Sequence, residues 1–239
     1  LRARPPGDLD LSPALLRNLS ETFIETLVEI HSVDYQGAGL GDLGQPAGYV
    51  RRQVEGWTKR YDAARTDEVR SIEQVARWLS GHAPADSPRA ALIHNDYKYD
   101  NLVLAPDDLA RVVAVLDWEM ATIGDPLMDL GTTLGYWVDA DDPAGWQRYG
   151  FGITSLAGNL RRAELVERYA QQTGRDIPDL VFYYAYGLLK IAVIVQQIYR
   201  RYRQGYTKDE RFAGLDALVR ACGLMAERAI EKKRIERLD

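Results

Sequence analysis

The sequence predicts an α+β protein that is mainly helical and carries one small β region near the middle of the chain. Two observations predict this class. Apolar residues recur at helical spacing before residue 90 and again after residue 125. Between residues 90 and 117, short apolar or β-branched runs alternate with polar clusters, which is typical of strands joined by tight turns. We therefore divide residues 1–239 into a helical part (1–89), a β-hairpin region (90–117) and a second helical part (118–239).

The first helical part contains three predicted helices. Ser12 is a suitable N-cap, and Pro13 suits the first helical turn. The apolar stripe that follows carries this helix to about His31, which we interpret as a histidine that lies in the core or braces a loop. Two further helices are expected at 46–61 and 68–79.

The β region consists of three runs, at 90–94, 101–105 and 111–117. The turn sequence Pro106-Asp107-Asp108 joins the last two runs, and we predict that all three form a small β-meander. After this region the chain returns to helical periodicity, in the ranges 125–137, 161–173, 179–204 and 209–238.

The range 180–198 is apolar enough to suggest a membrane span, but Lys190 interrupts it. An unpaired lysine is costly inside a bilayer. We therefore predict a buried core helix here and no membrane partner.

The composition favours a small-molecule substrate or a protein partner. The 239 residues are 46% hydrophobic, which is enough for a core, and they carry a net charge of −5 at pH 7. Because nonspecific binding to phosphate backbones requires clustered positive charge, this balance argues against a nucleic-acid partner. Cys222 is the single cysteine, so no intramolecular disulfide can form, and we expect it to be buried. The absence of disulfides suits a cytoplasmic location. The sequence leaves open whether the chain forms a homo-oligomer.

The stretch Gly39-Leu40-Gly41-Asp42-Leu43-Gly44 matches the G-x-G-x-x-G pattern of nucleotide-binding loops. The mechanism of that loop requires a strand before the glycines and a helix that begins at them. Here a predicted helix precedes the glycines and Gln45-Pro46 follows them. The strand and lysine that accompany a kinase glycine-rich loop are missing too. We predict a loop between two helices, without a nucleotide.

Three polar motifs surround the predicted hairpin. They read His94-Asn95-Asp96-Tyr97-Lys98-Tyr99-Asp100-Asn101 before it, then Asp117-Trp118-Glu119 and Gly124-Asp125-Pro126-Leu127-Met128-Asp129-Leu130 after it. In this order they resemble the catalytic loop and the second metal-binding aspartate of the protein-kinase-like superfamily. The residues of these motifs are similar to those of the aminoglycoside phosphotransferase and choline kinase branch. Within that branch it most resembles the phosphotransferase domains related to those fused with acyl-CoA dehydrogenases.

This resemblance covers essentially the whole chain and implies a protein-kinase-like fold. The chain then corresponds to the C-terminal lobe, and we expect the N-terminal β-rich lobe, with the phosphate loop and its lysine, to be absent from this sequence. We expect about 100 residues, the size of a small domain, to precede Leu1 in the natural protein. The implied activity is transfer of the γ-phosphoryl group of ATP or GTP to a small-molecule hydroxyl with Mg²⁺, and we expect this chain alone to be inactive.

The chemistry of phosphoryl transfer agrees with the residue roles that the resemblance implies. A carboxylate must accept the proton of the attacking hydroxyl, and Asp96 is the expected base. Mg²⁺ prefers oxygen ligands, so Asn101 and Asp117 are expected to hold the metal and the nucleotide. Glu119 would share a strand face with Asp117 if the extended backbone continues, and would then support the metal or hold a water molecule. Lys98 is assigned to catalysis and nucleotide binding, as a positive charge near the phosphoryl group, unless it is only an exposed loop lysine.

Other polar residues of these motifs are given structural roles. His94 is expected to bond the backbone and stiffen the loop. Asp125 suits the N-cap of the next helix, and Asp129 lies in its first turn, where a carboxylate is favourable. Asn95 stands where the family usually has glycine, and asparagine tolerates unusual backbone angles better than most residues.

The acceptor is expected to be a small molecule, because the interval between Asp117 and Asp125 is too short for a long activation segment. An aminoglycoside, a hydroxyacyl compound or another alcohol all stay open. One group of aromatic side chains either lines an acceptor pocket or packs in the core. It consists of Trp146, Tyr149, Phe151, Tyr183, Tyr184 and Tyr186.

Two other functions are alternatives to phosphoryl transfer. The first is a non-catalytic nucleotide-binding or scaffold module of the same fold. The second is a metal-dependent hydrolase that uses the same carboxylates on a water molecule. The joint presence of Asp96, Asn101 and Asp117 disfavours the first, and their ordered spacing disfavours the second.

Overall fold

The computed structural model describes residues 9, 11–150 and 152–239, and it is 56% helix and 8% strand. Its α-helices are α1 (Pro13–His31), α2 (Tyr49–Ala64), α3 (Arg70–Gly81), α4 (Pro126–Tyr136), α5 (Ala144–Gln147), α6 (Arg162–Thr173), α7 (Leu180–Arg203) and α8 (Leu215–Lys232). Its strands are β1 (Ala91–Ile93), β2 (Leu102–Ala105), β3 (Asp108–Val115) and β4 (Thr122–Gly124). The predicted mainly helical α+β class is confirmed.

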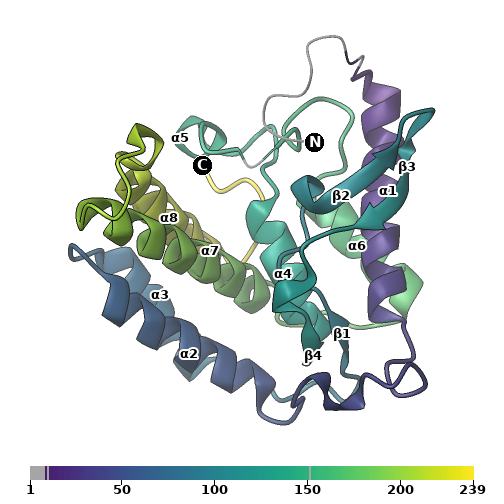
Figure 1. The fold of residues 1–239 in the computed structure, drawn as a ribbon, viewed down its shortest axis with the longest axis horizontal. Coiled ribbons are helices and arrows are strands. Elements are labelled where there is room, and N and C mark those ends of the chain that lie inside the picture. The colour runs from purple at the N-terminus through teal and green to yellow at the C-terminus, as the bar shows by residue number, and fades with distance from the viewer. Residues whose placement is uncertain (1–8, 10, 151) are drawn as a thin grey trace.

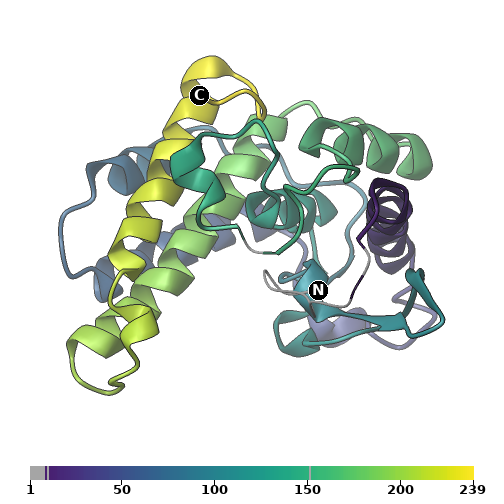
Figure 2. The same ribbon diagram turned by 90° about the horizontal axis from the view of Figure 1, so that it is seen from above.

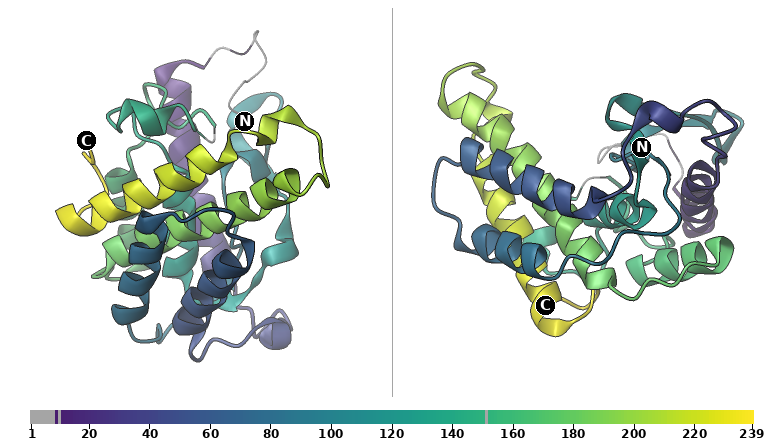
Figure 3. Two further views of the ribbon diagram at one scale, coloured as in Figure 1. Left: turned by 90° about the vertical axis from the view of Figure 1, so that its left-hand side faces the viewer. Right: turned by 90° about the horizontal axis from the view of Figure 1, so that it is seen from below.

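The helices form two groups on either side of α4 (Figure 1). On one side α2, α3, α7 and α8 pack together, and on the other side α1 packs against α6 and the β2–β3 hairpin. Figure 2 and the right view of Figure 3 show the same separation of α8 from α1. The loop between β1 and β2 lies beside α4, where the two groups meet.

The strands form two separate two-stranded sheets, so the predicted meander is wrong. β1 pairs antiparallel with β4, with Leu92 opposite Ile123. β2 pairs antiparallel with β3, with Leu102 opposite Val115. The physical reason is that the loop after β1 carries the chain away to a second sheet, and β4 returns to pair with β1. β4 was not predicted, because three residues are too few to show a periodicity.

Helix caps agree with the sequence where the chain supplies a side-chain oxygen. The hydroxyl of Ser12 accepts a hydrogen bond from the Leu15 amide, and the carboxylate of Asp125 accepts one from the Leu127 amide. The last helix begins at Leu215 and not at 209, because Glu210–Phe212 forms a 3-10 turn first. The short helix α5 was not predicted.

The helix α7 forms the centre of the molecule, as predicted for the range 180–198. By length and composition α7 could span a membrane, but 78% of its apolar window is buried inside the protein. Lys190 and Gln196 are buried with the apolar residues. Cys222, on the adjacent α8, is buried as predicted, and burial raises the pKa of its thiol.

Two glycines allow α4 and α7 to pack unusually closely. A Cβ atom at Gly187 would lie 2.1 Å from the carbonyl oxygen of Gly131, and one at Gly131 would lie 2.1 Å from the carbonyl oxygen of Tyr183. Backbone therefore contacts backbone where these helices cross. A third glycine, Gly44, lies against the backbone of β4 in the loop between α1 and α2. The glycine motif at 39–44 thus serves as a loop between helices, as predicted.

A buried ion cluster joins α6 to the segment after α4. The guanidinium of Arg162 donates to both carboxylate oxygens of Asp142, at 2.6 and 2.5 Å, and lies 3.4 Å from Asp139. All three side chains are at most 1% exposed. Burial raises the pKa of Asp139 to about 6, since one arginine must compensate two carboxylates.

Candidate active site

The carboxylate of Asp96 is held by three hydrogen-bond donors. Its Oδ1 accepts from the hydroxyl of Tyr136 at 2.8 Å. Its Oδ2 accepts from Lys98 Nζ at 2.5 Å and from Asn101 Nδ2 at 3.3 Å. The loop therefore brings three predicted site residues together. Tyr136, at the end of α4, adds a contact that the sequence did not predict. The side chain of Asp96 remains 13% exposed, so a small molecule can reach it.

The loop that carries Asp96 is fixed from below by Asp129. One oxygen of Asp129 accepts from the His94 amide at 2.7 Å and the other from the Asn95 amide at 2.8 Å. His31 Nε2 lies 3.1 Å from the same carboxylate. Although burial opposes ionisation, the bonds from His31 and from the His94 amide hold the pKa of Asp129 below its usual value. His31 is thus a buried histidine that braces the loop, as expected. Asp129 also has a structural role, but it braces this loop and not the start of its own helix.

Both ring nitrogens of His94 are occupied by the backbone. Nε2 lies 2.8 Å from the Leu116 carbonyl and donates to it, and Nδ1 accepts from the Asp96 amide at 3.2 Å. This tautomer ties the loop to the end of β3. His94 is thus the stiffening residue that the sequence predicted, and neither nitrogen is left to transfer a proton.

Asn95 adopts the left-handed conformation, with φ of 67°. Its side chain also makes contacts that a glycine could not make. Its Nδ2 donates to the Met120 carbonyl at 3.1 Å, and its amide group lies 3.2 Å from the hydroxyl of Tyr49. The buried ammonium of Lys190 donates to the backbone carbonyl of Asn95. Asparagine here keeps the backbone angle and links the loop to α2 and α7.

Asn101 and Asp117 lie next to each other across the β2–β3 hairpin. The Leu116 amide donates to the Asn101 carbonyl at 2.7 Å, and Asp117 is the next residue. Nδ2 of Asn101 is used by the Asp96 carbonyl at 2.8 Å, which leaves Oδ1 as an acceptor. Asp117 is exposed and has a φ of 70°, which is strained for a residue with a Cβ atom.

The position of Glu119 differs from the prediction. The chain does not stay extended after Asp117, because its left-handed backbone starts a 3-10 turn at Trp118–Met120. Glu119 therefore does not share a strand face with Asp117, and it is exposed. The alternation of side chains expected for an extended strand already ends at Asp117.

The residues at the hairpin end fit a magnesium ion bound together with a nucleotide. Within the described part of the chain, no group of three or more His, Cys, Asp or Glu residues could hold a metal ion. Mg²⁺ needs fewer protein ligands, because it keeps waters and takes nucleotide phosphates. Asn101 Oδ1 and the exposed Asp117 carboxylate would supply the one or two oxygens that such a site requires.

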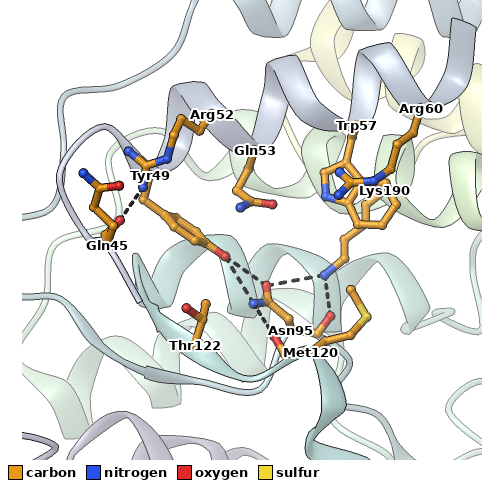
Figure 4. A pocket seen from close by; sticks show the side chains of 10 residues that line it. All are labelled: Gln45, Tyr49, Arg52, Gln53, Trp57, Arg60, Asn95, Met120, Thr122 and Lys190. Atoms are coloured by element: carbon orange, nitrogen blue, oxygen red, sulfur yellow. Dashed lines mark hydrogen bonds between the residues drawn. The ribbon is translucent and has the colours of Figure 1, made fainter. Parts of the chain in front are cut away.

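A pocket of 290 Å³ opens beside this loop, between α2 and α7 (Figure 4). Asn95 and Lys190 form its floor, and Arg52, Gln53 and Arg60 of α2 project over it. Burial lowers the pKa of Lys190 to about 8, although Asp129 and Asp96 oppose this shift. The sequence did not predict this pocket, because its residues come from segments nearly 150 positions apart.

The aromatic residues expected either at an acceptor pocket or in the core are mostly core residues. Trp146, Tyr184 and Tyr186 are at most 2% exposed. Tyr183 is also buried, with its hydroxyl 3.5 Å from Asp125. Phe151 lies outside the described residues. The core-packing alternative therefore holds for the four buried side chains.

The sequence matches the model of the phosphotransferase enzyme family over residues 1–179. The chain belongs to that family. A family member of known structure from Ralstonia eutropha, provisionally described as an aminoglycoside phosphotransferase, is 33% identical with a TM-score of 0.83, and the match covers 97% of this chain and 69% of that one. A spectinomycin phosphotransferase in complex with ADP and spectinomycin has a TM-score of 0.55 at 12% identity over 95% of this chain and 69% of that one, which shows a shared fold.

Curated relatives of this phosphotransferase-family chain are acyl-CoA dehydrogenase family members. Member 11 from Gallus gallus is 36% identical over 87% of this chain, and member 10 from Mus musculus is 34% identical over 83%. The chain spans 27% of the first and 18% of the second. The family and the branch expected from the motifs are thereby confirmed.

Proposed function

We propose that this chain transfers the γ-phosphoryl group of ATP or GTP to a hydroxyl group of a small molecule, with Asp96 as the base. The observation that carries the proposal is the carboxylate of Asp96, which is held by Tyr136, Lys98 and Asn101 in a member of the phosphotransferase family. Structural neighbours named for macrolides and spectinomycin support a small-molecule acceptor.

In this proposal Asp96 orients the acceptor hydroxyl and takes its proton as the oxygen bonds to the γ-phosphorus. The bond from that phosphorus to the bridging oxygen breaks, and ADP or GDP leaves with this oxygen. A carboxylate held in one direction favours the near-attack geometry, because little orientation is lost in the transition state. Lys98 places an ammonium 2.5 Å from Asp96. When the proton moves to Asp96, negative charge develops on the attacking oxygen and the phosphoryl oxygens, and this ammonium would stabilise it.

Asn101 and Asp117 would hold Mg²⁺, with Glu119 as an outer, exposed carboxylate. The metal would neutralise charge on the nucleotide phosphates. We further propose that the chain supplies the C-terminal lobe of the kinase-like fold and shares the nucleotide with a β-rich lobe. Consistent with that, exposed apolar side chains on the hairpin and after it offer a surface for the purine ring of the nucleotide: Val103, Val113, Leu116 and Trp118. The chain alone would then bind nucleotide weakly.

The decisive variant is Asp96→Asn, measured in the protein at its full natural length. We expect acceptor-dependent release of ADP or GDP to fall by about 10³-fold, because general-base catalysis contributes about 10² to 10⁴. Nucleotide binding, measured by calorimetry with Mg²⁺, should stay within a factor of two or so, since the metal ligands are untouched. Acceptors are screened as a panel of alcohols.

Asp100→Asn is the matched control, because Asp100 is an exposed carboxylate on the same loop. It should leave both transfer and binding unchanged. Undiminished transfer in Asp96→Asn would disprove the assignment of the base. Nucleotide binding without transfer to any alcohol in the unmodified protein would favour the non-catalytic module.

A further inference from the structure

The pocket beside the catalytic loop is lined by positive charge without a matching carboxylate. Arg52, Arg60 and Lys190 line it, and its lining contains neither Asp nor Glu. No carboxylate oxygen among the residues that the structure describes lies within 4.0 Å of any of these three cations. Three cations around one concavity repel each other, so a bound anion would stabilise them.

In the described part of the chain, the direct contacts that hold these cations in place are made by neutral groups. The guanidinium of Arg52 donates to the backbone carbonyls of Gln45 and Ala47. The guanidinium of Arg60 lies 4.8 Å from the centre of the Trp57 ring. Lys190 is 1% exposed and is bonded to Asn95. Such contacts fix the geometry of each charge. They leave the charges of the two arginines without a carboxylate partner, and the more distant Asp129 and Asp96 offset that of Lys190 only in part.

The pocket is adjacent to the base. Its floor residue Asn95 immediately precedes Asp96, and Lys190 lies near enough to interact electrostatically with the Asp96 carboxylate. Its volume of 290 Å³ lies at the small end of ligand pockets, which span about 300–1,000 Å³. That space suits a small charged group better than an entire antibiotic.

We propose that this pocket binds an anionic group of the acceptor, a carboxylate or a phosphate ester, through Arg52, Arg60 and Lys190. The acceptor is then a small anionic alcohol whose hydroxyl reaches Asp96 while its anionic end occupies the pocket. This inference rests on the proposed phosphotransferase function. Gln53 and Thr122 supply neutral hydrogen-bonding groups on the remaining walls.

Binding of the anion alone tests the pocket without any need for turnover. In the protein at full natural length, inorganic phosphate and acetate are titrated and followed by ligand-observed NMR. We expect Arg60→Gln and Arg52→Gln each to weaken anion binding by about tenfold, the worth of one charge-assisted hydrogen bond. Arg60→Gln leaves the backbone contacts of the loop intact, so a folded variant is assured even if Arg52→Gln disturbs the loop.

Arg51→Gln is the matched control, since it removes the same charge from an exposed position of α2 that does not line the pocket. It should leave anion binding unchanged. Equal binding in Arg60→Gln and in the unmodified protein, or equal losses in Arg60→Gln and Arg51→Gln, would overturn the inference. Absence of any phosphate or acetate binding would overturn it as well.

Paired acceptors separate this inference from the function on which it rests. Glycerol 3-phosphate is compared with glycerol, and 3-hydroxybutyrate with butane-1,3-diol, by ADP release. Preference for one or both anionic partners, lost in Arg60→Gln, supports the inference and identifies phosphate or carboxylate as the group. Equal transfer to charged and neutral alcohols refutes the anionic acceptor but keeps the phosphotransferase. Anion binding that needs Arg60, without transfer to any alcohol, keeps the pocket but refutes the phosphotransferase.

Discussion

Tyr136 is the residue whose contribution to the site is most direct among those the sequence did not indicate. It is the last residue of α4, and its hydroxyl donates to Asp96 Oδ1 at 2.8 Å. The bond restrains the rotation of the carboxylate at Oδ1, while Lys98 contacts the other oxygen, Oδ2. We therefore regard Tyr136 as a positioning residue for the base.

Replacing Tyr136 by Phe should lower kcat about tenfold while leaving the KM for nucleotide unchanged. A hydrogen bond to a charged group contributes about 1.5–3 kcal/mol, and about 1.4 kcal/mol corresponds to tenfold in rate. Steady-state kinetics at full natural length measure both constants. Tyr97→Phe is the control, because its hydroxyl donates to the Phe23 carbonyl at 2.7 Å, away from the carboxylate. An equal loss of kcat in both variants would reduce Tyr136 to a stability role.

At the residue scale, the sequence predicts a side chain well when its partners are close along the chain. Asp96, Lys98 and Asn101 lie within one loop, and the structure places them in mutual contact. Tyr136 and Lys190 come from distant helices, and no local pattern relates them to the loop. The unusual lysine in an apolar helix was a usable signal, because a buried ammonium requires a polar partner.

At the scale of elements, the crossing of α4 and α7 connects packing with the site. α4 carries both Asp129 and Tyr136, so its position relative to the loop sets the geometry of the Asp96 carboxylate. Its closest approach to α7 occurs at Gly131 and Gly187, where backbone meets backbone. A side chain at this crossing would displace the helix that orients Asp96.

The variant Gly187→Ala should therefore destabilise the protein by about 3 kcal/mol and lower transfer activity in the folded fraction. Overpacking typically costs about 1–3 kcal/mol, and here the opposing atom is backbone and cannot rotate away. Urea denaturation measures the free energy of unfolding. Gly145→Ala is the control, because a Cβ atom at that helical position meets nothing within 4 Å. Equal stability of the two variants would contradict the close crossing.

Elements of helical type were predicted from periodicity with shifts of a few residues at their ends, because tertiary packing barely alters which residues can be helical. Pairing of strands was not predictable in the same way. The segment at β1 offers no local information on whether its partner is β2 or β4, since three buried residues satisfy either arrangement. The left-handed Asp117, which ends the extended backbone, also has no signature in a single sequence.

At the scale of the whole molecule, the buried cluster of Arg162, Asp139 and Asp142 makes stability depend on pH. The pKa of Asp139 is about 6 in the folded state, above its usual 3.8, so the folded protein binds more protons than the unfolded chain between these values. The contribution of Asp139 to stability is therefore fully present below pH 3.8 and is lost as the pH rises through 6.

Relative to Asp139→Asn, the unmodified protein should lose about 2 to 3 kcal/mol of stability between pH 4 and pH 7, because each unit of pKa corresponds to about 1.4 kcal/mol. Denaturant unfolding at intervals of one pH unit measures the difference. Asp141→Asn is the control, since Asp141 is more than a third exposed and pairs with Arg161 at the surface. If the difference in stability between Asp139→Asn and the unmodified protein stays constant with pH, Asp139 and Asp142 do not share Arg162 in the way inferred.

The crowded surroundings of Asp96 have a regiochemical consequence. A carboxylate offers about four lone-pair directions, and Tyr136, Lys98 and Asn101 take up three of them. An incoming hydroxyl would thus approach from one side. An acceptor whose other end is anchored in the adjacent pocket can bring to this direction only a hydroxyl at one distance from that end. Of the several hydroxyls on a polyol, we then expect one to be phosphorylated and the others to remain free.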